Sequence, residues 1–410
     1  MQEWKVEKCE NSSGPTDVPG FLASGIHADV RLKQNGQLDL GILYSPTPCT
    51  VAGVFTRNRV RAAPVSFDED VLAKGTLLHG VVANSGNANA CTGEQGMANT
   101  QEMAALAAQR MQTPEDSFLV CSTGRIGRQL PMPQIRKGIA DAADALGSQP
   151  SDGLAFANCI LTSDTRNKKC TLRITNGSTT VTVSGVAKGA GMIRPDMATM
   201  LAFLCTDLEM DTASLKAELK AAADRSFNAI TVDGDMSTND TVLCFANGAS
   251  QVKWAEADDA FKRCFREALL KVCEHLAYLI VGDGEKITKV VTLRITGANN
   301  ESDARQVAYA IAHSPLVKSS WAGSDPNWGR VIAAVGYSGV PVHEDRLCMD
   351  YDGTAVVRKG TPRDENLPKW KECVARKQFE IHVDLGMGEA ETRLIASDLT
   401  PEYITFNMKE

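Results

Sequence analysis

The sequence predicts a protein in which strands and helices alternate, and two patterns indicate this class. Short apolar runs bounded by turn residues are typical of buried strands, and such runs span residues 77–84, 117–122 and 200–205. Apolar side chains with a 3.6-residue period predict a long amphipathic helix from about Asp258 to Ile280. With 410 residues, the chain is long enough for one large or two ordinary domains.

The composition excludes several classes of function. Hydrophobic residues make up 43% of the chain and charged residues 23%, which is ordinary for a globular protein. A net charge of −7 argues against nucleic-acid binding, which needs a basic surface. No apolar run is long enough for a membrane helix, and the acidic N-terminal stretch is neither a secretory signal nor a transit peptide. We therefore expect a cytoplasmic protein without nucleic-acid or membrane partners.

The cysteines and histidines give no sign of a metal or of disulfides. The twelve cysteines are scattered without any C-x-x-C pair, and many lie in apolar runs, where they act as small buried side chains. The six histidines are dispersed, and no cluster has metal-ligand spacing. We predict no metal and no cofactor.

In the first part of the chain, residues 38–44 and 50–56 are predicted to be two strands. The small polar residues 84–93 predict a tight loop, and Thr92 with Gln95 three residues later predicts a helix cap. The run 117–122 predicts a buried strand, which ends at Thr123 and Gly124. A strand that ends in this way exposes backbone N–H groups that a ligand could use, although the residues alone favour a plain strand-to-loop turn.

A hairpin precedes the most informative stretch. The strands at 169–175 and 178–186 flank Asn176-Gly177, which is a strong two-residue turn signal. The second strand leads directly into Lys188, which on chemistry alone could be a solvated lysine at a strand end.

Further along, Asp211 is predicted to cap a helix, and residues 227–235 are predicted to form a strand that runs into an acidic turn. The acids in and after this turn lack the bidentate Glu of a calcium loop, so no calcium site is expected. Asp325 with Pro326 predicts another helix start.

The stretch Lys188–Leu201 reads KGAGMIRPDMATML. Its two glycines allow a bend, and Pro195 constrains the chain before Thr199. Thr199 is either an ordinary strand threonine or a cryptic N-terminal nucleophile. If the bond from Ala198 to Thr199 is cut, Thr199 gains an α-amine, whose usual pKa of about 7.7–8.0 allows it to accept the hydroxyl proton.

This motif closely resembles the self-cleavage motif of the ornithine acetyltransferase family, the glutamate N-acetyltransferases of arginine biosynthesis. The resemblance extends over nearly the whole chain. It implies an α/β fold with layered helices and sheets, of the ornithine acetyltransferase–DmpA type. It also implies self-cleavage into an α-chain of residues 1–198 and a β-chain of residues 199–410, assembled as a heterotetramer of two α- and two β-chains.

The resemblance implies a role for each candidate residue that matches the family. Thr199 is the nucleophile, and Thr123 with Gly124 forms the oxyanion hole. The implied substrate contacts are Thr162, Lys188, Thr199, Glu285 and Asn407. The sequence departs from the family at two places: Lys286-Ile287 stands where the family has Gly-Ala, and a threonine expected beyond Asn407 is missing before Glu410.

The activity implied is acetyl transfer from N-acetylornithine to glutamate through an acyl-enzyme, in a ping-pong scheme. Three alternatives remain open at this point. The enzyme could also take acetyl from acetyl-CoA, which would make it bifunctional. It could be a related self-cleaving amidase or aminopeptidase, in which water replaces glutamate. It could also be a binding protein without catalytic activity on the same scaffold.

Overall fold

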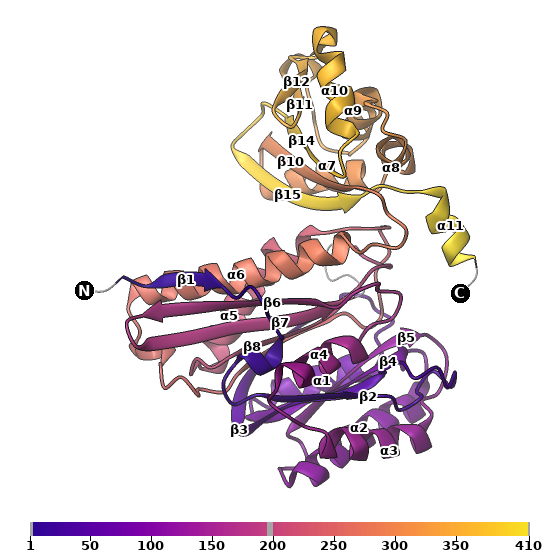
Figure 1. The fold of residues 1–410 in the computed structure, drawn as a ribbon. Coiled ribbons are helices and arrows are strands. Elements are labelled where there is room, and N and C mark those ends of the chain that lie inside the picture. Colours follow the sequence, from indigo (N-terminus) through magenta and orange to yellow (C-terminus); the bar gives the residue numbers. More distant parts are fainter. Residues whose placement is uncertain (1–2, 195–199, 409–410) are drawn as a thin grey trace. The chain divides into compact units, whose positions relative to one another are not determined.

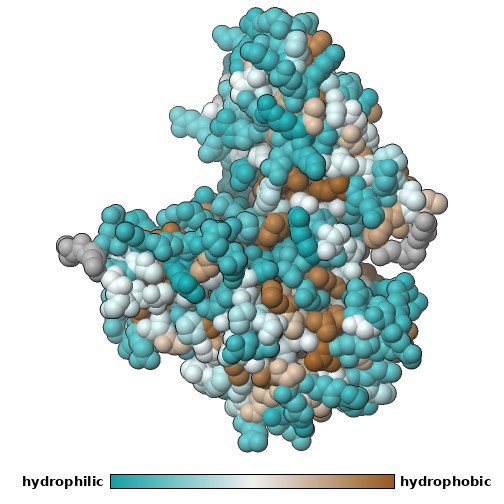
Figure 2. Space-filling model, viewed as in Figure 1, coloured by the Kyte–Doolittle hydropathy of each residue, from teal (hydrophilic) through white to brown (hydrophobic). Residues whose placement is uncertain are grey.

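The computed structural model describes residues 3–194 and 200–408, which fold into two compact units (Figure 1). Of the described residues, unit 1 comprises 3–189, 200–228 and 236–280, and unit 2 comprises 190–194, 229–235 and 281–408. Among the described residues, no helix is long and apolar enough to cross a membrane. Figure 2 shows polar and charged side chains over most of the visible surface, with scattered apolar patches.

The strands of unit 1 form one nine-stranded sheet in the order β1-β6-β7-β8-β9-β3-β4-β5, with β2 paired to β3. Their bounds are β1 Lys5–Lys8, β2 Leu22–Ile26, β3 Leu40–Phe55, β4 Leu78–Asn87, β5 Phe118–Arg125, β6 Lys168–Asn176, β7 Thr179–Lys188, β8 Leu201–Thr206 and β9 Thr241–Ala246. Strand β3 connects the two halves of the sheet, because residues 40–44 pair with β2 and β4 whereas residues 50–55 pair with β9. The pairs β4–β5 and β8–β9 are parallel.

Helices cover both outer faces of this sheet and also lie between its halves. Their bounds are α1 Ala63–Ala73, α2 Gly93–Met111, α3 Met132–Asp144, α4 Pro150–Cys159, α5 Thr212–Arg225 and α6 Asp259–Val281. Helices α2 and α3 pack on β3, β4 and β5 through Met103, Ile135 and Ile139. Residues of α1 and α4 join the core between the two halves. Helix α6 packs on β7, where Gly185 leaves room for Leu276. The unit is therefore a layered α/β structure, as predicted.

Unit 2 has a smaller sheet in the order β13-β12-β11-β14-β10-β15. Its elements are β10 Val290–Ala298, α7 Glu301–Ala312, α8 Pro315–Ala322, α9 Trp328–Gly336, β11 Cys348–Tyr351, β12 Thr354–Arg358, β13 Thr361–Pro362, α10 Leu367–Val374, β14 Gln378–Asp384, β15 Ala390–Ser397 and α11 Pro401–Asn407. Helix α7 packs on β10 and β15, and α10 packs on β11, β12 and β14. The two buried tryptophans Trp321 and Trp370 belong to this core.

Several predicted elements are confirmed. The long amphipathic helix is α6, and the hairpin is β6–β7. Its two turn residues are Gly177, with φ +61°, and Ser178, one position later than predicted, because Asn176 still pairs with Thr179. Asp211 caps α5, because its Oδ1 accepts from the backbone N of Ser214 at 2.9 Å. All six residues of β8 are buried, as expected for a strand whose two faces are both covered.

Other predicted elements were wrong. The two strands predicted at 38–44 and 50–56 are the single strand β3. The strand predicted at 227–235 is absent: residues 227–229 form a short 3-10 helix. The backbone N–H groups of Val232 and Gly234 donate to the carbonyl oxygen of Ile193 instead of joining a sheet.

Two predicted helix caps were also wrong. Thr92 makes no capping bond to α2, because its hydroxyl donates to Asn89 Oδ1 at 2.7 Å. Helix α9 begins at Trp328 after Asn327, so Asp325 precedes the cap position.

Candidate active site

Thr123 and Gly124 lie at the end of β5, beside β4. Thr123 is 4% exposed, whereas Gly124 is exposed and has φ +134°, a conformation that favours glycine. A Cβ atom at position 124 would lie 2.3 Å from the carbonyl carbon of Gly86 and 2.5 Å from the backbone N of Asn87. The close approach of β4 therefore requires glycine here.

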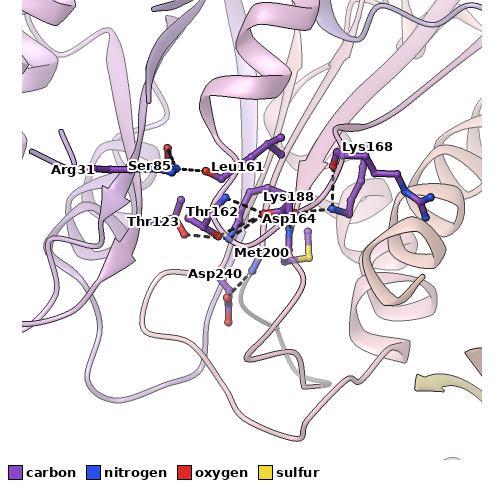
Figure 3. Close-up of polar contacts among 12 residues, drawn as sticks. Arg31, Ser85, Thr123, Leu161, Thr162, Asp164, Lys168, Lys188, Met200 and Asp240 are labelled. Atoms are coloured by element: carbon purple, nitrogen blue, oxygen red, sulfur yellow. Dashed lines mark hydrogen bonds and ion pairs between the residues drawn. The ribbon is translucent and has the colours of Figure 1, made fainter. Parts of the chain in front are cut away.

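Lys188, the last residue of β7, is a buried cation beside Thr123 (Figure 3). Its Nζ donates to Thr123 Oγ1 at 3.3 Å. It also lies 4.0 Å from Asp164 Oδ2, and the side chains of Lys188 and Asp164 are 3% and 0% exposed. The solvated lysine considered from the sequence is therefore excluded.

Asp164 is the acceptor on which this cluster converges. Its Oδ1 accepts from Lys168 Nζ at 2.6 Å and from the backbone N of Gly189 at 2.7 Å. Its Oδ2 accepts from the backbone N of Thr162 at 3.0 Å, and the Thr162 hydroxyl lies 3.5 Å away. The carboxylate thus fixes both Thr162 and the chain that follows Lys188.

The charge of Asp164 is set by two opposing effects. Burial raises the pKa of this carboxyl group, but the ammonium groups of Lys188 and Lys168 and the hydrogen bond from Gly189 lower it by more. Its pKa is therefore well below the usual range, and the group is ionised at neutral pH.

Arg31 connects the segment before Thr162 to the end of β4 (Figure 3). Its Nη2 donates to Ser85 Oγ at 2.9 Å and to the carbonyl oxygen of Leu161 at 2.5 Å. The side chain thus holds the start of the 162–164 turn against the sheet.

Thr199 and Ala198 lie outside the described residues, but the chain directly after them is anchored. The backbone N of Met200 donates to Asp240 Oδ1 at 3.0 Å, and the carbonyl oxygen of Met200 accepts from the backbone N of Thr241. Asp240 is fully buried, and among the described residues its Oδ2 has no hydrogen-bond partner. Burial raises the pKa of Asp240 well above its usual range.

The two remaining candidate residues meet within unit 2. Asn407 Nδ2, on α11, donates to Glu285 Oε2 at 3.1 Å. Glu285 also contacts the stretch 188–194. Its backbone N donates to the carbonyl oxygen of Ala190, and a Cβ atom added at Gly191 would lie 2.5 Å from the Glu285 carboxylate. Lys286, which stands where the family has glycine, has φ +56°. The local path is thus one that glycine adopts easily and that lysine adopts here at a cost in strain.

A second carboxylate holds the first part of the motif in unit 2. Asp233 Oδ2 accepts from the backbone N of Met192 at 2.7 Å, and its Oδ1 accepts from that of Ile193 at 2.9 Å. The Tyr403 hydroxyl of α11 donates to the same carboxylate at 3.2 Å. This acid, which was predicted only as part of a turn, therefore holds residues 192 and 193.

The structure brings Thr123, Gly124, Thr162 and Lys188 together in unit 1, and Glu285 with Asn407 in unit 2. The sequence reasoning missed Asp164, Lys168 and Asp240 as site residues. Asp164 follows Thr162 by two residues, and this spacing is the only signal that could have indicated it. Within residues 3–194 and 200–408, no cluster of three or more His, Cys, Asp or Glu side chains could hold a metal ion.

Comparison with known proteins gives a consistent assignment. The sequence model of the ArgJ family matches residues 22–409. The chain is 44% identical over 396 residues to the arginine biosynthesis bifunctional protein ArgJ of Symbiobacterium thermophilum, covering 97% of this chain and 98% of the relative. It is 43% identical over 392 residues to the protein of the same name from Geobacter sulfurreducens, covering 95% and 98%.

Two solved structures are similar over part of the chain. A crystal structure of ArgJ from Bacillus halodurans is 38% identical, covers 48% of this chain and 99% of its own, and has a TM-score of 0.45. The ornithine acetyltransferase of Mycobacterium tuberculosis, solved with ornithine, is 35% identical, covers 47% of this chain and 98% of its own, and has a TM-score of 0.42.

The protein is thus an enzyme of the acyltransferase class. More particularly, the chain belongs to the ArgJ family, the acetyl-transferring enzymes of arginine biosynthesis.

Proposed function

We propose that the chain cuts itself between Ala198 and Thr199, and that the freed Thr199 carries acetyl from N-acetylornithine to glutamate. The observation that supports this most directly is the buried contact between Lys188, at the head of the motif, and Thr123. A buried ammonium group and a hydroxyl are both groups that can donate to a developing oxyanion.

Self-cleavage forms the nucleophile. The Thr199 hydroxyl attacks the carbonyl carbon of Ala198, and the peptide C–N bond breaks as the Thr199 nitrogen takes up a proton. Water then hydrolyses the ester, which leaves a carboxylate on Ala198 and a free hydroxyl and α-amine on Thr199. The products are an α-chain of 198 residues and a β-chain of the remaining 212.

Acetyl transfer then uses the same groups. The Thr199 hydroxyl attacks the acetyl carbonyl carbon of N-acetylornithine while the α-amine takes its proton. The C–N bond of the substrate breaks, and ornithine leaves with that proton on its amine. The amine of glutamate next attacks the acetyl ester, and the Thr199 hydroxyl regains a proton. Thr123 and Gly124 donate to the oxyanion in each step.

The substrate carries both a carboxylate and ammonium groups. We assign Glu285, with Asn407 beside it, to the substrate amine, and Thr162 and Lys188 to its acetyl and carboxylate oxygens. The ornithine bound to the Mycobacterium tuberculosis relative supports an amino-acid substrate of this kind. No cofactor takes part in these steps.

A second activity is suggested by the word bifunctional in the names of the relatives. In this activity, acetyl-CoA acetylates Thr199, and glutamate accepts the acetyl group as before. Formation of N-acetylglutamate from acetyl-CoA and glutamate alone would demonstrate this activity. Its absence would mean that the chain has only the transfer from N-acetylornithine.

The proposal is tested by intact mass under denaturing conditions, for the wild type, Thr199→Ser and Thr199→Ala. Two fragments that meet at Ala198 and Thr199 in the wild type and the serine variant, with one uncut chain in the alanine variant, are expected. A single uncut chain in the wild type would refute the mechanism. Native mass should be twice that of the 44.0 kDa chain if two α- and two β-chains assemble.

The kinetic order gives an independent test. Varying N-acetylornithine at several glutamate concentrations should give parallel double-reciprocal lines, because the two substrates never occupy the enzyme together. Intersecting lines would refute the acyl-enzyme. Free acetate released without glutamate would identify an amidase instead.

A further inference from the structure

Lys188 lies between the side chains of Thr123 and Asp164. On one side its Nζ donates to Thr123 Oγ1 at 3.3 Å, and on the other it lies 4.0 Å from Asp164 Oδ2 (Figure 3). The charged end of a lysine is normally solvated, but this side chain is only 3% exposed. The order Asp164, Lys188, Thr123 is therefore built into the interior of unit 1.

This order determines what the Thr123 hydroxyl can do. An ammonium group has three donors and no acceptor, so Thr123 must accept from Lys188. The one hydrogen of the Thr123 hydroxyl is then directed elsewhere. A hydroxyl that accepts a hydrogen bond from a cation also becomes a better donor. The contact with Lys188 thus makes Thr123 an oriented and strengthened donor.

Asp164 fixes this arrangement at two points. It accepts from the backbone N of Gly189, which directly follows Lys188, and it faces the Lys188 ammonium group. It is shared with Lys168, whose side chain is completely buried, so both ammonium groups contact this carboxylate. Buried ammonium groups stabilise negative charge that forms close to them.

We propose that Asp164 is a positioning residue that acts through Lys188 to aim the Thr123 hydroxyl at the oxyanion. The inference rests on the acyl transfer proposed above and specifies its oxyanion site. It assigns Lys188 to the acetyl oxygen of the substrate rather than to the substrate carboxylate. Loss of the Asp164 charge should therefore slow the chemical steps more than it weakens substrate binding, which Asp164 affects only through the backbone of Thr162.

The main test compares Asp164→Asn with Asp207→Asn. Asparagine at 164 keeps an oxygen that can accept from Gly189 but removes the charge. Asp207 is a matched control, because it is also buried in unit 1 and accepts from a backbone N, that of Thr182, at 2.7 Å. We expect Asp164→Asn to lower kcat by roughly 10- to 100-fold, somewhat less than the 10²–10³ typical for removal of an oxyanion donor. KM for both substrates should change less than about threefold, as for a contact made only in the transition state.

Self-cleavage provides a second readout, because it passes through an oxyanion of the same kind. The fraction of uncut chain, followed with time after synthesis, should fall more slowly in Asp164→Asn than in Asp207→Asn. If Asp164→Asn is never cut and so has no transfer activity, the fraction of uncut chain still reports the effect of the substitution.

A double-mutant cycle with Lys188→Met shows whether Asp164 acts through Lys188. If it does, Asp164→Asn adds less than about threefold to the loss caused by Lys188→Met alone.

Three results would overturn the proposal. One is wild-type kcat in Asp164→Asn. Another is a large rise in KM with kcat unchanged, which would assign Lys188 to substrate binding. A third is full additivity with Lys188→Met. If the wild-type enzyme showed neither cleavage nor transfer, the proposed function itself would be wrong. The three results above leave wild-type activity intact, so they contradict only the role of Asp164.

Discussion

The contact between Gly124 and β4 leads to a quantitative prediction for Gly124→Ala. The new Cβ would lie 2.3 Å from Gly86 and 2.5 Å from Asn87, whereas carbon atoms in contact normally lie about 3.5–4.0 Å apart. Strands β4 and β5 must therefore separate by about 1 Å near this residue. Overpacking of this kind costs about 1–3 kcal/mol, and a strained backbone angle adds about 1–3 kcal/mol.

We therefore expect Gly124→Ala to lose about 2–6 kcal/mol of the free energy of unfolding, a large part of the 5–15 kcal/mol typical of proteins. A displacement of about 1 Å in a catalytic group also costs on the order of 10²-fold in rate. Urea denaturation and kcat for acetyl transfer measure the two effects separately.

The matched control is Gly127→Ala. Gly127 lies in the exposed loop directly after β5 and also has a positive φ of +81°, but a Cβ atom added there would have no atom within 4 Å. It thus reports the conformational cost alone. If Gly124→Ala matched Gly127→Ala within about 1 kcal/mol and twofold in kcat, the argument from the contact with β4 would fail.

Three other predictions concern charge and space. Glu285→Gln should raise KM for N-acetylornithine by roughly 10- to 100-fold, because hydrogen bonds to charged groups contribute about 1.5–3 kcal/mol, and an unchanged KM in steady-state kinetics would contradict the assignment. Gly191→Ala should also raise KM, because its Cβ would displace the Glu285 carboxylate, while the urea midpoint should stay close to wild type; a large loss of stability would show that the side chain cannot move aside. Burial raises the pKa of Asp207 to about 6, so stability of the wild type relative to Asp207→Asn should be greatest below about pH 4 and be lost as the pH rises through about 6, by roughly 2–3 kcal/mol in total. Urea titrations from pH 4 to 8 test this, and a gap that is independent of pH would refute it.

The elements predicted correctly are those that local signals determine. The signal Asn176-Gly177 specifies a hairpin with only two residues, although the turn itself lies at Gly177 and Ser178, and the side-chain period of α6 needs no partner. The prediction of two strands in place of β3 was wrong, and the residues between them, which include Pro46 and Pro48, are typical of a break between strands. In the structure these prolines are exposed, and the pairing is interrupted between Tyr44 and Cys49, so the missing N–H groups remove no ladder bond.

The candidate site was predictable only in part, for a similar reason. Thr123, Gly124 and Lys188 lie at strand ends beside recognisable motifs. Asp164 and Asp240 acquire their roles from donors far away in the sequence or across a turn, such as the backbone N–H groups of Gly189 and Met200. The residues next to an aspartate in the sequence do not indicate which distant backbone N–H group will donate to its carboxylate.

The order of strands in unit 1 relates the folding of the chain to the proposed cut between Ala198 and Thr199. Strands β8 and β9 follow the proposed cut, yet they lie between β7 and β3, which precede it. The two pieces are thus interleaved: residues 183–188 pair with 201–206 on one side, and residues 50–55 pair with 241–246 on the other. Once cut and unfolded, the fragments would have to find each other as two molecules, so renaturation should become dependent on concentration. The uncut Thr199→Ala chain should refold as a single molecule, and if the chain is cut as proposed, we expect its sheet to form before the cut.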